Sequence, residues 1–166
     1  MLPVVFDLSR IPVLLAGRGE ALAKRRRQLE EYGAVALTVL EGIPAAADIA
    51  AHRLVMLAGL PKEEAGRVAQ ACRTAGRLLN VEDVNELCDF YFTANVRRGD
   101  LVISVSTGGH SPTLAQKIRD WIAAQFSEEW EKRVTEIGQL RRQWKSEGRN
   151  LSSASHEHIA RKQWLA

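Results

Sequence analysis

Short apolar runs alternate with helical stretches through the first half of the chain. The apolar runs have the length of strands and cover residues 11–16, 35–40, 54–58 and 78–81. The stretches between them have helical composition or turn residues and cover residues 20–32, 48–51 and 61–75. Strands buried on both faces read as continuous apolar runs, and parallel strands need a crossover that is usually a helix. The alternation therefore predicts an α/β fold built on a parallel sheet.

The pattern changes in the second half of the chain. Residues 90–96 and 101–106 alternate as strands do, and the Arg-Arg-Gly-Asp sequence between them, residues 97–100, is typical of a hairpin turn. From Pro112 almost to the end, the chain has a helical pattern. This half is therefore predicted to be a β-hairpin followed by helices.

Tryptophan residues mark the helical part. Trp130 and Trp144 recur with other apolar residues at helical spacing. A stripe of this kind favours a core or a subunit interface over a cofactor contact. We therefore predict three parts: an α/β domain, a hairpin region that forms dimer contacts and a helical domain. They cover residues 1–88, 89–126 and 127–166.

Size, charge and cysteine content narrow the class of protein. With 166 residues, 46% of them hydrophobic, the chain can bury the core of one domain plus a smaller appendage. Its net charge of +3 comes largely from residues 24–27 and 141–142, which we expect on solvated helix faces. Cys72 and Cys88 show no Cys-x-x-Cys spacing, and no apolar run approaches the ~18 residues of a membrane span. We expect a reduced, cytoplasmic protein with no nucleic-acid or membrane partner.

A glycine turn joins the first predicted strand to the first helix. Gly17 would allow the tight turn, and Gly19 would let a pyrophosphate approach the backbone at the helix N-terminus, as in dinucleotide sites. Glu41 ends the next strand, where an acid can bind a ribose hydroxyl. The third position of the motif holds Leu22, where Gly or Ala would allow close packing of helix and strand. The same residues also fit a strand-to-helix turn that binds no nucleotide.

Polar residues follow the fourth predicted strand. Its end is Asn80-Val81-Glu82-Asp83, and ligands of open parallel sheets bind beyond the carboxyl ends of the strands. A carboxylate there, that of Asp83, can face the reactive end of a nucleotide and accept a proton. The alternative is that Asp83 only caps the turn that follows.

A second glycine-rich turn, Thr107 to Pro112, links a predicted strand to a predicted helix. Ser111 is placed to be the N-cap and Pro112 the first helical residue. Two glycines let the backbone approach a ligand closely, and hydroxyls with free N–H groups at a helix N-terminus suit an anion. The alternative is a well-capped turn without a ligand.

The histidines do not form a predicted metal site. His110 stands beside the two glycines, and it either contacts a substrate carboxylate or a metal or is simply exposed in a loop. His156 and His158 lie two residues apart on a predicted helix and do not share a face. We expect both of them at the surface, without a role as ligands.

Taken together, these residues resemble the precorrin-2 dehydrogenase/sirohydrochlorin ferrochelatase family, whose members make sirohaem or supply cobalamin synthesis. The resemblance covers roughly residues 2–145. The segments that carry it are residues 2–8 (Leu-Pro-Val-Val-Phe-Asp-Leu), 17–20, 80–83, 90–92, 97–101 and 104–112. The order Asn-Val-x-Asp, aromatic hairpin and Ser-Thr-Gly-Gly-x-Ser-Pro is its specific part.

The family resemblance implies a fold and an activity. It implies a Rossmann-like NAD-binding domain, a dimerisation region and a small helical domain, with two chains exchanging elements in a homodimer and active sites between the domains. It implies an oxidoreductase that converts precorrin-2, a tetrapyrrole, to sirohydrochlorin with NAD⁺. Some members also insert Fe²⁺, which is then a chelatase substrate.

Single positions carry over from the family. Asp83 falls on the catalytic aspartate, a proposed general base, and Thr107 on an active-site Ser or Thr. Cofactor contacts are expected from Gly17, Gly19, Glu20 and Ala21, and from Glu41 by the reasoning above. Substrate contacts are expected from Asn80, Thr107, Gly108, His110 and Ser111.

Departures from the family pattern lie in the nucleotide half. Arg18 replaces the usual middle glycine, Leu22 replaces a small residue, and residues 58–61 stand where the family has a Thr-Asp-Asp-like stretch. The segment between Glu41 and Leu54 is also short. These departures favour an alternative, a tetrapyrrole chelatase or a non-catalytic tetrapyrrole-binding module with impaired NAD binding. A Rossmann-type dehydrogenase for another small molecule is a third hypothesis.

Overall fold

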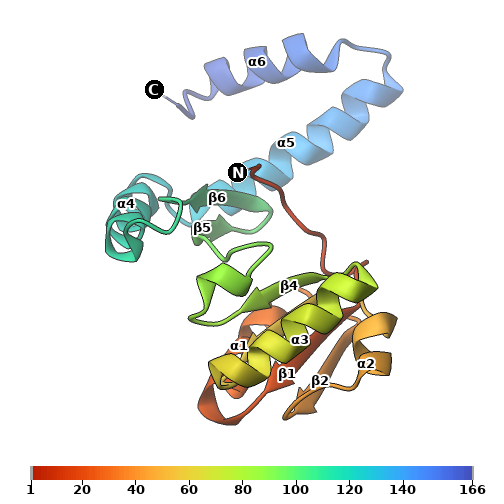
Figure 1. Ribbon diagram of the computed structural model, residues 1–166. Helices are drawn as coiled ribbons and strands as arrows, with labels where there is room; N and C mark the ends of the chain where they lie inside the picture. The colour runs from red at the N-terminus through yellow and green to blue at the C-terminus, as the bar shows by residue number, and fades with distance from the viewer. Residues whose placement is uncertain (1, 166) are drawn as a thin grey trace. The chain divides into compact units, whose positions relative to one another are not determined.

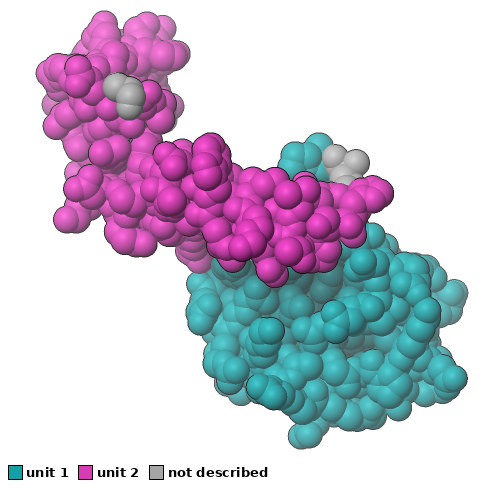
Figure 2. Space-filling model, turned by 90° about the vertical axis from the view of Figure 1, so that its left-hand side faces the viewer, with its two compact units in different colours: residues 1–92 teal, residues 93–166 magenta. Residues whose placement is uncertain are grey.

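The expected parallel sheet is present in residues 1–92, the first of two units into which the chain divides (Figures 1 and 2). The computed structural model describes residues 2–165. The strands of the first unit are β1 (Val13–Gly17), β2 (Leu37–Glu41), β3 (Leu54–Ala58) and β4 (Leu78–Val81). Its helices are α1 (Gly19–Glu31), α2 (Ala46–Ala51), α3 (Lys62–Ala75) and the one-turn 3₁₀ helix η1 (Asn85–Leu87). The α/β fold class predicted from the sequence is confirmed.

The four strands run parallel in the order β2-β1-β3-β4. Alternate side chains of β1 enter two separate cores: Leu14 packs with α2 and α3, and Leu15 packs with α1. Every residue of β1 and β3 is buried, because helices cover both faces of the sheet. The order of the strands reverses at β1, so the crevice beyond the carboxyl ends of β1 and β3 is where ligands of such sheets bind.

Side chains after β4 hold the chain against the edge of the sheet. The carboxylate of Asp89 accepts from the Leu79 N–H at 2.9 Å, and the Asp89 N–H donates to the Leu79 carbonyl at 2.7 Å. The predicted strand over residues 90–96 is wrong in its first part, since strand structure begins only at Ala94. Phe90 and Phe92 instead pack their rings against the core under α1. Because these two rings pack into that core, the backbone of residues 90–92 does not pair with β6.

The basic run at residues 24–27 is not a uniformly solvated helix face. Lys24, Arg26 and Arg27 are exposed, but Arg25 is half-buried. Its guanidinium lies 4.2 Å from the centroid of the Phe92 ring and 3.3 Å from a carboxylate oxygen of Glu82. The expectation from composition is therefore corrected at Arg25, which ties α1 to the segment after β4.

The second unit holds the predicted hairpin and helices. Strands β5 (Ala94–Arg98) and β6 (Leu101–Val105) pair antiparallel across a turn at Gly99 and Asp100. Three helices follow: α4 (Pro112–Gln125), α5 (Glu129–Ser146) and α6 (Leu151–Arg161). Because the unit boundary lies between Phe92 and Thr93 and no further division is resolved, the predicted division at residues 88 and 126 stays a prediction.

His158 is not a surface residue, contrary to expectation. It is only 7% exposed, and its ring lies between those of Trp144 and Trp164 in edge-to-face contacts. Its Nε2 atom lies 3.0 Å from a carboxylate oxygen of Glu136. The two-residue spacing between His156 and His158 indicates only that they face different sides of α6, and it does not say which side is buried. The polar link to Glu136 joins α6 to α5 and satisfies the buried ring.

Arg98 joins the hairpin to the end of α4, and its removal should destabilise the second unit. Its Nε–H donates to the carbonyl of Phe126 at 2.8 Å, and a further N–H reaches the carbonyl of Ala123 at 3.4 Å. Arg98→Met should lower the free energy of unfolding by about 1–3 kcal/mol, because part-buried carbonyls lose their donor. Urea denaturation measures this. Arg97→Met, on the exposed neighbour, is the control, and an equal loss in both variants would contradict the assignment.

Candidate functional site

The turn after β1 is built so tightly that only glycine fits at Gly17. The Gly17 carbonyl accepts from the Gly42 N–H at 2.7 Å, and the next N–H, of Arg18, donates to the Ala58 carbonyl at 3.0 Å. A Cβ atom on Gly17 would lie 1.7 Å from the Ala58 carbonyl oxygen. Gly17, the first glycine of the predicted motif, therefore lets the end of β1 lie close to the backbone that follows β2 and β3.

Gly59 and Ala21 together replace the missing third small residue of the motif. A Cβ atom on Gly59 would lie 2.4 Å from the Arg18 carbonyl oxygen and 3.2 Å from the Cβ atom of Ala21. The backbone of Gly59 adopts φ +69°, which glycine tolerates best. Leu22 packs into the core under α1. The departure at residues 58–61 thus allows a close helix-to-loop contact that Ala21, not Leu22, makes from the helix side.

Gly19, by contrast, faces open space. It is the first residue of α1, has φ +64°, and a Cβ atom built on it would meet no atom within 4 Å. No side chain at this position covers the first turn of α1, whose free backbone N–H groups attract an anion. The residues of this turn therefore fit the diphosphate of a dinucleotide.

The other predicted cofactor residues surround this turn. Glu20 and Ala21 lie in the first turn of α1. Glu41 is exposed at the carboxyl end of β2, paired in register with Gly17. The structure thus brings the predicted cofactor residues to one edge of the sheet, with Glu41 at the end of the strand next to β1.

Ion pairs also line this edge, and sequence reasoning missed them. Arg18 donates to a carboxylate oxygen of Glu64, in the first turn of α3, at 2.6 Å. Lys62 pairs with Glu86 in the same way, from the start of α3 to η1. The residues of each pair are far apart in the chain, so no local pattern could reveal them. For Arg18 alone the sequence held a sign of such a pair, because a charged side chain occupies the middle position of the glycine motif.

Asp83 lies just beyond the end of β4 in an unusual backbone conformation. Its φ is +61°, a left-handed value that Asp tolerates better than most residues with a side chain. The preceding residue is fixed: the Glu82 N–H donates to the Leu57 carbonyl at 2.9 Å, and the Glu82 carboxylate pairs with Arg25. Asp83 itself is exposed. Backbone strain of this kind gathers at functional sites, which supports a role for this carboxylate.

Asn80, in β4, and Cys88, just after η1, bond to the protein itself. Asn80 is 6% exposed, and its amide donates to the Phe90 carbonyl at 2.8 Å. The Cys88 thiol donates to the Val81 carbonyl at 3.2 Å and accepts from the Val81 N–H at 3.1 Å. Burial raises the pKa of Cys88. These groups support the backbone that presents Asp83.

The turn from Thr107 to Pro112 has the predicted N-cap. The Ser111 hydroxyl accepts from the Leu114 N–H at 3.2 Å, and Pro112 is the first helical residue of α4. The Thr107 hydroxyl accepts from the Ser111 N–H at 3.1 Å and donates to the Ser111 carbonyl at 3.0 Å. Both hydroxyls thus shape the turn.

The tip of this turn is exposed. Gly108 and Gly109 adopt φ +64° and +85°, and His110 is exposed beside them. The Gly108 N–H donates to the Ser106 hydroxyl at 3.2 Å. Groups that can meet a ligand here are the backbone of the glycines and the His110 ring, while Thr107 and Ser111 hold that backbone in place.

The described part of the chain contains neither a metal-ligand cluster nor a membrane-spanning helix. Within residues 2–165, no group of three or more His, Cys, Asp or Glu side chains is arranged to hold a metal ion. No helix in that range combines the length and the apolar character needed to cross a membrane.

Family models match two parts of the chain. Residues 36–94 match a model described as putative NAD(P)-binding, and this match begins after the glycine turn at Gly17. Residues 98–125 match a model described as sirohaem biosynthesis protein, central. The two matches follow each other along the chain in the order of the predicted nucleotide and hairpin regions.

Curated relatives come from sirohaem synthesis. The chain is 31% identical over 137 residues to the siroheme synthase of Methylococcus capsulatus, which covers 71% of this chain and 29% of that protein. It is 39% identical over 87 residues to a siroheme biosynthesis protein of Saccharomyces cerevisiae, covering 48% of this chain and 32% of that protein. The matches thus span less than a third of each relative's length.

A solved structure shares the fold. The chain matches SirC, a precorrin-2 dehydrogenase, with a TM-score of 0.68 and 20% sequence identity, over 85% of this chain and 79% of that one. The likeness therefore extends beyond the α/β unit into the hairpin and helices.

Proposed function

We propose that this chain, which belongs to the precorrin-2 dehydrogenase/sirohydrochlorin ferrochelatase family, oxidises precorrin-2 to sirohydrochlorin with NAD⁺. The observation that carries the proposal is Asp83, an exposed carboxylate held in left-handed backbone at the carboxyl end of β4. The glycine turn at Gly17 and Gly19 follows β1 of the same sheet. A proton acceptor and a dinucleotide-binding turn on one α/β unit are what this oxidation needs.

The reaction removes a hydride and a proton from the tetrapyrrole. NAD⁺, when bound, supplies the hydride acceptor. The Asp83 carboxylate accepts the proton as general base, so both hydrogens leaving the substrate have a destination. Glu82, whose backbone and carboxylate are both bonded, holds the backbone next to Asp83 in place.

The cofactor residues each have a separate task in this proposal. Gly19 leaves room for the diphosphate at the N-terminus of α1, and Glu20 and Ala21 continue the helix that presents its N–H groups. Gly17 holds the turn closed against β3. Glu41 accepts hydrogen bonds from the ribose hydroxyls.

The Thr107–Pro112 turn binds the substrate in this proposal. Precorrin-2 carries several carboxylate side chains, which suit backbone N–H groups at the start of α4 and the His110 ring. Thr107, Gly108 and Ser111 shape this turn, and Asn80 orders the backbone below Asp83.

We also propose a homodimer, with α4 at the subunit interface. Leu114, Ile118 and Trp121 recur on one side of α4, and they are 52%, 37% and 67% exposed. Both strands of the β5–β6 hairpin have an unpaired edge within residues 2–165. Free strand edges and an exposed apolar helix face are surfaces that favour association with another chain.

Charge on this helix face should prevent the homodimer. Ile118→Glu should raise the dimer dissociation constant about 30-fold or more, as expected when an anchor worth ~2 kcal/mol is lost from an interface. Sedimentation equilibrium measures this. Gln116→Glu, which adds the same charge at an exposed position on the opposite side of α4, is the control. Unchanged association of the Ile118 variant would place the interface elsewhere.

The alternative function is a tetrapyrrole chelatase or a binding module with impaired NAD binding. In it, Fe²⁺ would be a substrate of the chelatase and not a resident metal. The altered glycine motif favoured this alternative, but Gly59 and Ala21 supply the close packing that Leu22 does not. Calorimetric titration of NAD⁺ separates the two: a dissociation constant between about 1 μM and a few mM supports the dehydrogenase.

We also propose that the protein acts in the cytoplasm, where free thiols such as those of Cys72 and Cys88 persist.

A further inference from the structure

Arg18 is placed at the proposed dinucleotide site but bonds to the protein. It is the N-cap residue of α1, between the tight turn at Gly17 and the open position at Gly19. Its guanidinium donates to the Glu64 carboxylate at 2.6 Å. The Arg18 and Glu64 side chains are 44% and 23% exposed, so this ion pair is in contact with solvent.

We propose that Arg18 is a phosphate-binding residue of the nucleotide site and that Glu64 competes with the nucleotide for its guanidinium. This inference rests on the proposed function, because it takes the dinucleotide diphosphate to lie at the N-terminus of α1. Binding then exchanges one charge-assisted hydrogen bond, to the Glu64 carboxylate, for another, to a phosphate oxygen. Arg18 is suited to this since guanidinium groups bind carboxylates and phosphates with the same planar arrangement of N–H groups.

The direction of the side chain identifies the phosphate. Glu64 lies on α3, which follows β3, whereas Glu41 ends β2 on the other side of β1. Arg18 thus reaches away from the strand whose end would bind the ribose. The anionic group on that side that a guanidinium would bind is the diphosphate, which NAD⁺ shares with ADP and NADP⁺. Its contribution should be equal for these ligands and absent for adenosine.

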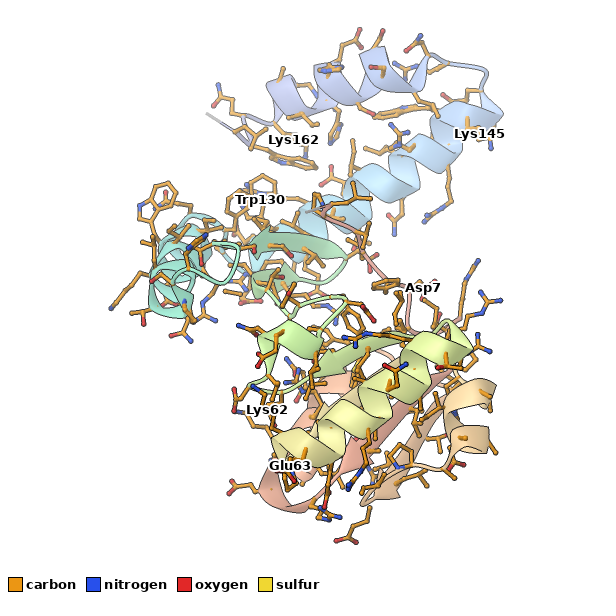
Figure 3. The ribbon with its side chains drawn as sticks, in the orientation of Figure 1. Asp7, Lys62, Glu63, Trp130, Lys145 and Lys162 are labelled. Atoms are coloured by element: carbon orange, nitrogen blue, oxygen red, sulfur yellow. The ribbon has the colours of Figure 1, made fainter. Side chains whose placement is uncertain are left out.

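The chain offers a matched control for Glu64. Glu63 is the adjacent acid in the same first turn of α3, and it is exposed (Figure 3). Glu63→Gln removes the same charge from the same helix end, and Glu64→Gln in addition frees Arg18. The difference between these two variants measures the competition and not the general effect of an acid near the site.

Calorimetric titration of ADP and NAD⁺ into the full chain tests the inference. Glu64→Gln should bind both ligands roughly threefold more tightly than the Glu63→Gln variant, in keeping with the strength of a solvent-exposed ion pair. Arg18→Gln should bind both at least about tenfold more weakly, since a hydrogen bond to a charged group is lost. In the double variant, Glu64→Gln should have no effect, because Glu64 acts through Arg18.

Different failures have different meanings. Weaker ADP binding by Glu64→Gln, or binding equal to that of Glu63→Gln, overturns the inference, because the ion pair would then only support the turn. An effect of Glu64→Gln that persists without Arg18 also overturns it. These results leave the proposed function intact. Normal ADP and NAD⁺ binding without oxidation of precorrin-2 overturns the proposed function and leaves the role of Arg18 standing.

Discussion

Asp83→Asn should slow NADH formation from precorrin-2 at least about 100-fold while leaving the fold and NAD⁺ affinity unchanged. Asn has nearly the same shape as Asp and also tolerates the left-handed backbone found at φ +61°, so the loop after β4 should keep its course. The amide cannot accept the substrate proton. We expect kcat to fall by about 10²- to 10⁴-fold, the usual contribution of a general base. Initial rates of NADH formation measure this.

Two further variants make the Asp83 result specific. Glu63→Gln neutralises an exposed carboxylate in the first turn of α3 and should keep the rate of the natural protein. Asp83→Ala should be as inactive as Asp83→Asn, but also less stable by about 1–2 kcal/mol, since Ala tolerates left-handed backbone poorly. An Asp83→Asn protein that oxidises precorrin-2 at the normal rate would remove this residue from the chemistry.

Gly17→Ala should destabilise the α/β unit severely. The new Cβ atom would lie 1.7 Å from the Ala58 carbonyl oxygen, and this contact is with backbone that the Arg18 N–H already fixes. Relief requires β1 and β3 to separate at their ends, so we expect a loss above about 4 kcal/mol, or no folded protein. Circular dichroism during urea denaturation measures the change.

Gly19→Ala provides the contrasting result. The added Cβ atom meets nothing within 4 Å, so the chain should fold with a loss of about 1–2 kcal/mol from left-handed backbone. NAD⁺ affinity should nevertheless fall, because the methyl group occupies the space in front of α1. Gly33→Ala, also at positive φ and in open space but at the other end of α1, is the control and should keep NAD⁺ affinity. Equal affinity in all three proteins would mean that no ligand approaches Gly19.

Sequence patterns predicted the parts of the fold that depend on local composition. The buried runs at β3 and β4 have the predicted limits, because uninterrupted apolar residues between turns leave few other solutions. The N-cap at Ser111 was predictable since Pro112 marks the first helical residue. The glycine turn after β1 was predictable for the same reason, as Gly17 and Gly19 stand between a strand and a helix.

Features that depend on contacts between distant residues were not predictable. Phe90 and Phe92 have the alternation of a strand, yet their rings complete the core under α1. Arg25 belongs to a basic run, but a partner 57 residues away draws it in from solvent. His158 lacked any local sign of burial because Glu136, its partner, lies on another helix.

The altered glycine motif shows how one site can be misjudged position by position. Leu22 breaks the pattern when it is compared with a single expected residue. In the structure, the close approach is made instead by Ala21 and Gly59, which come from different segments. Arg18 likewise breaks the pattern but brings a cation to the glycine turn after β1. The pattern alone could not show these compensations, since they depend on how the turn after β3 meets α1.

The oxidation itself is the most direct test of the proposed function. Precorrin-2 and NAD⁺ should be incubated with the purified chain without oxygen, and NADH and sirohydrochlorin followed together by absorbance. We expect both to appear in equal amounts, neither to appear when NAD⁺ is left out, and both to form at least about 100-fold more slowly when Asp83→Asn replaces the natural protein. Bound NAD⁺ with no sirohydrochlorin formed by the natural protein would contradict it.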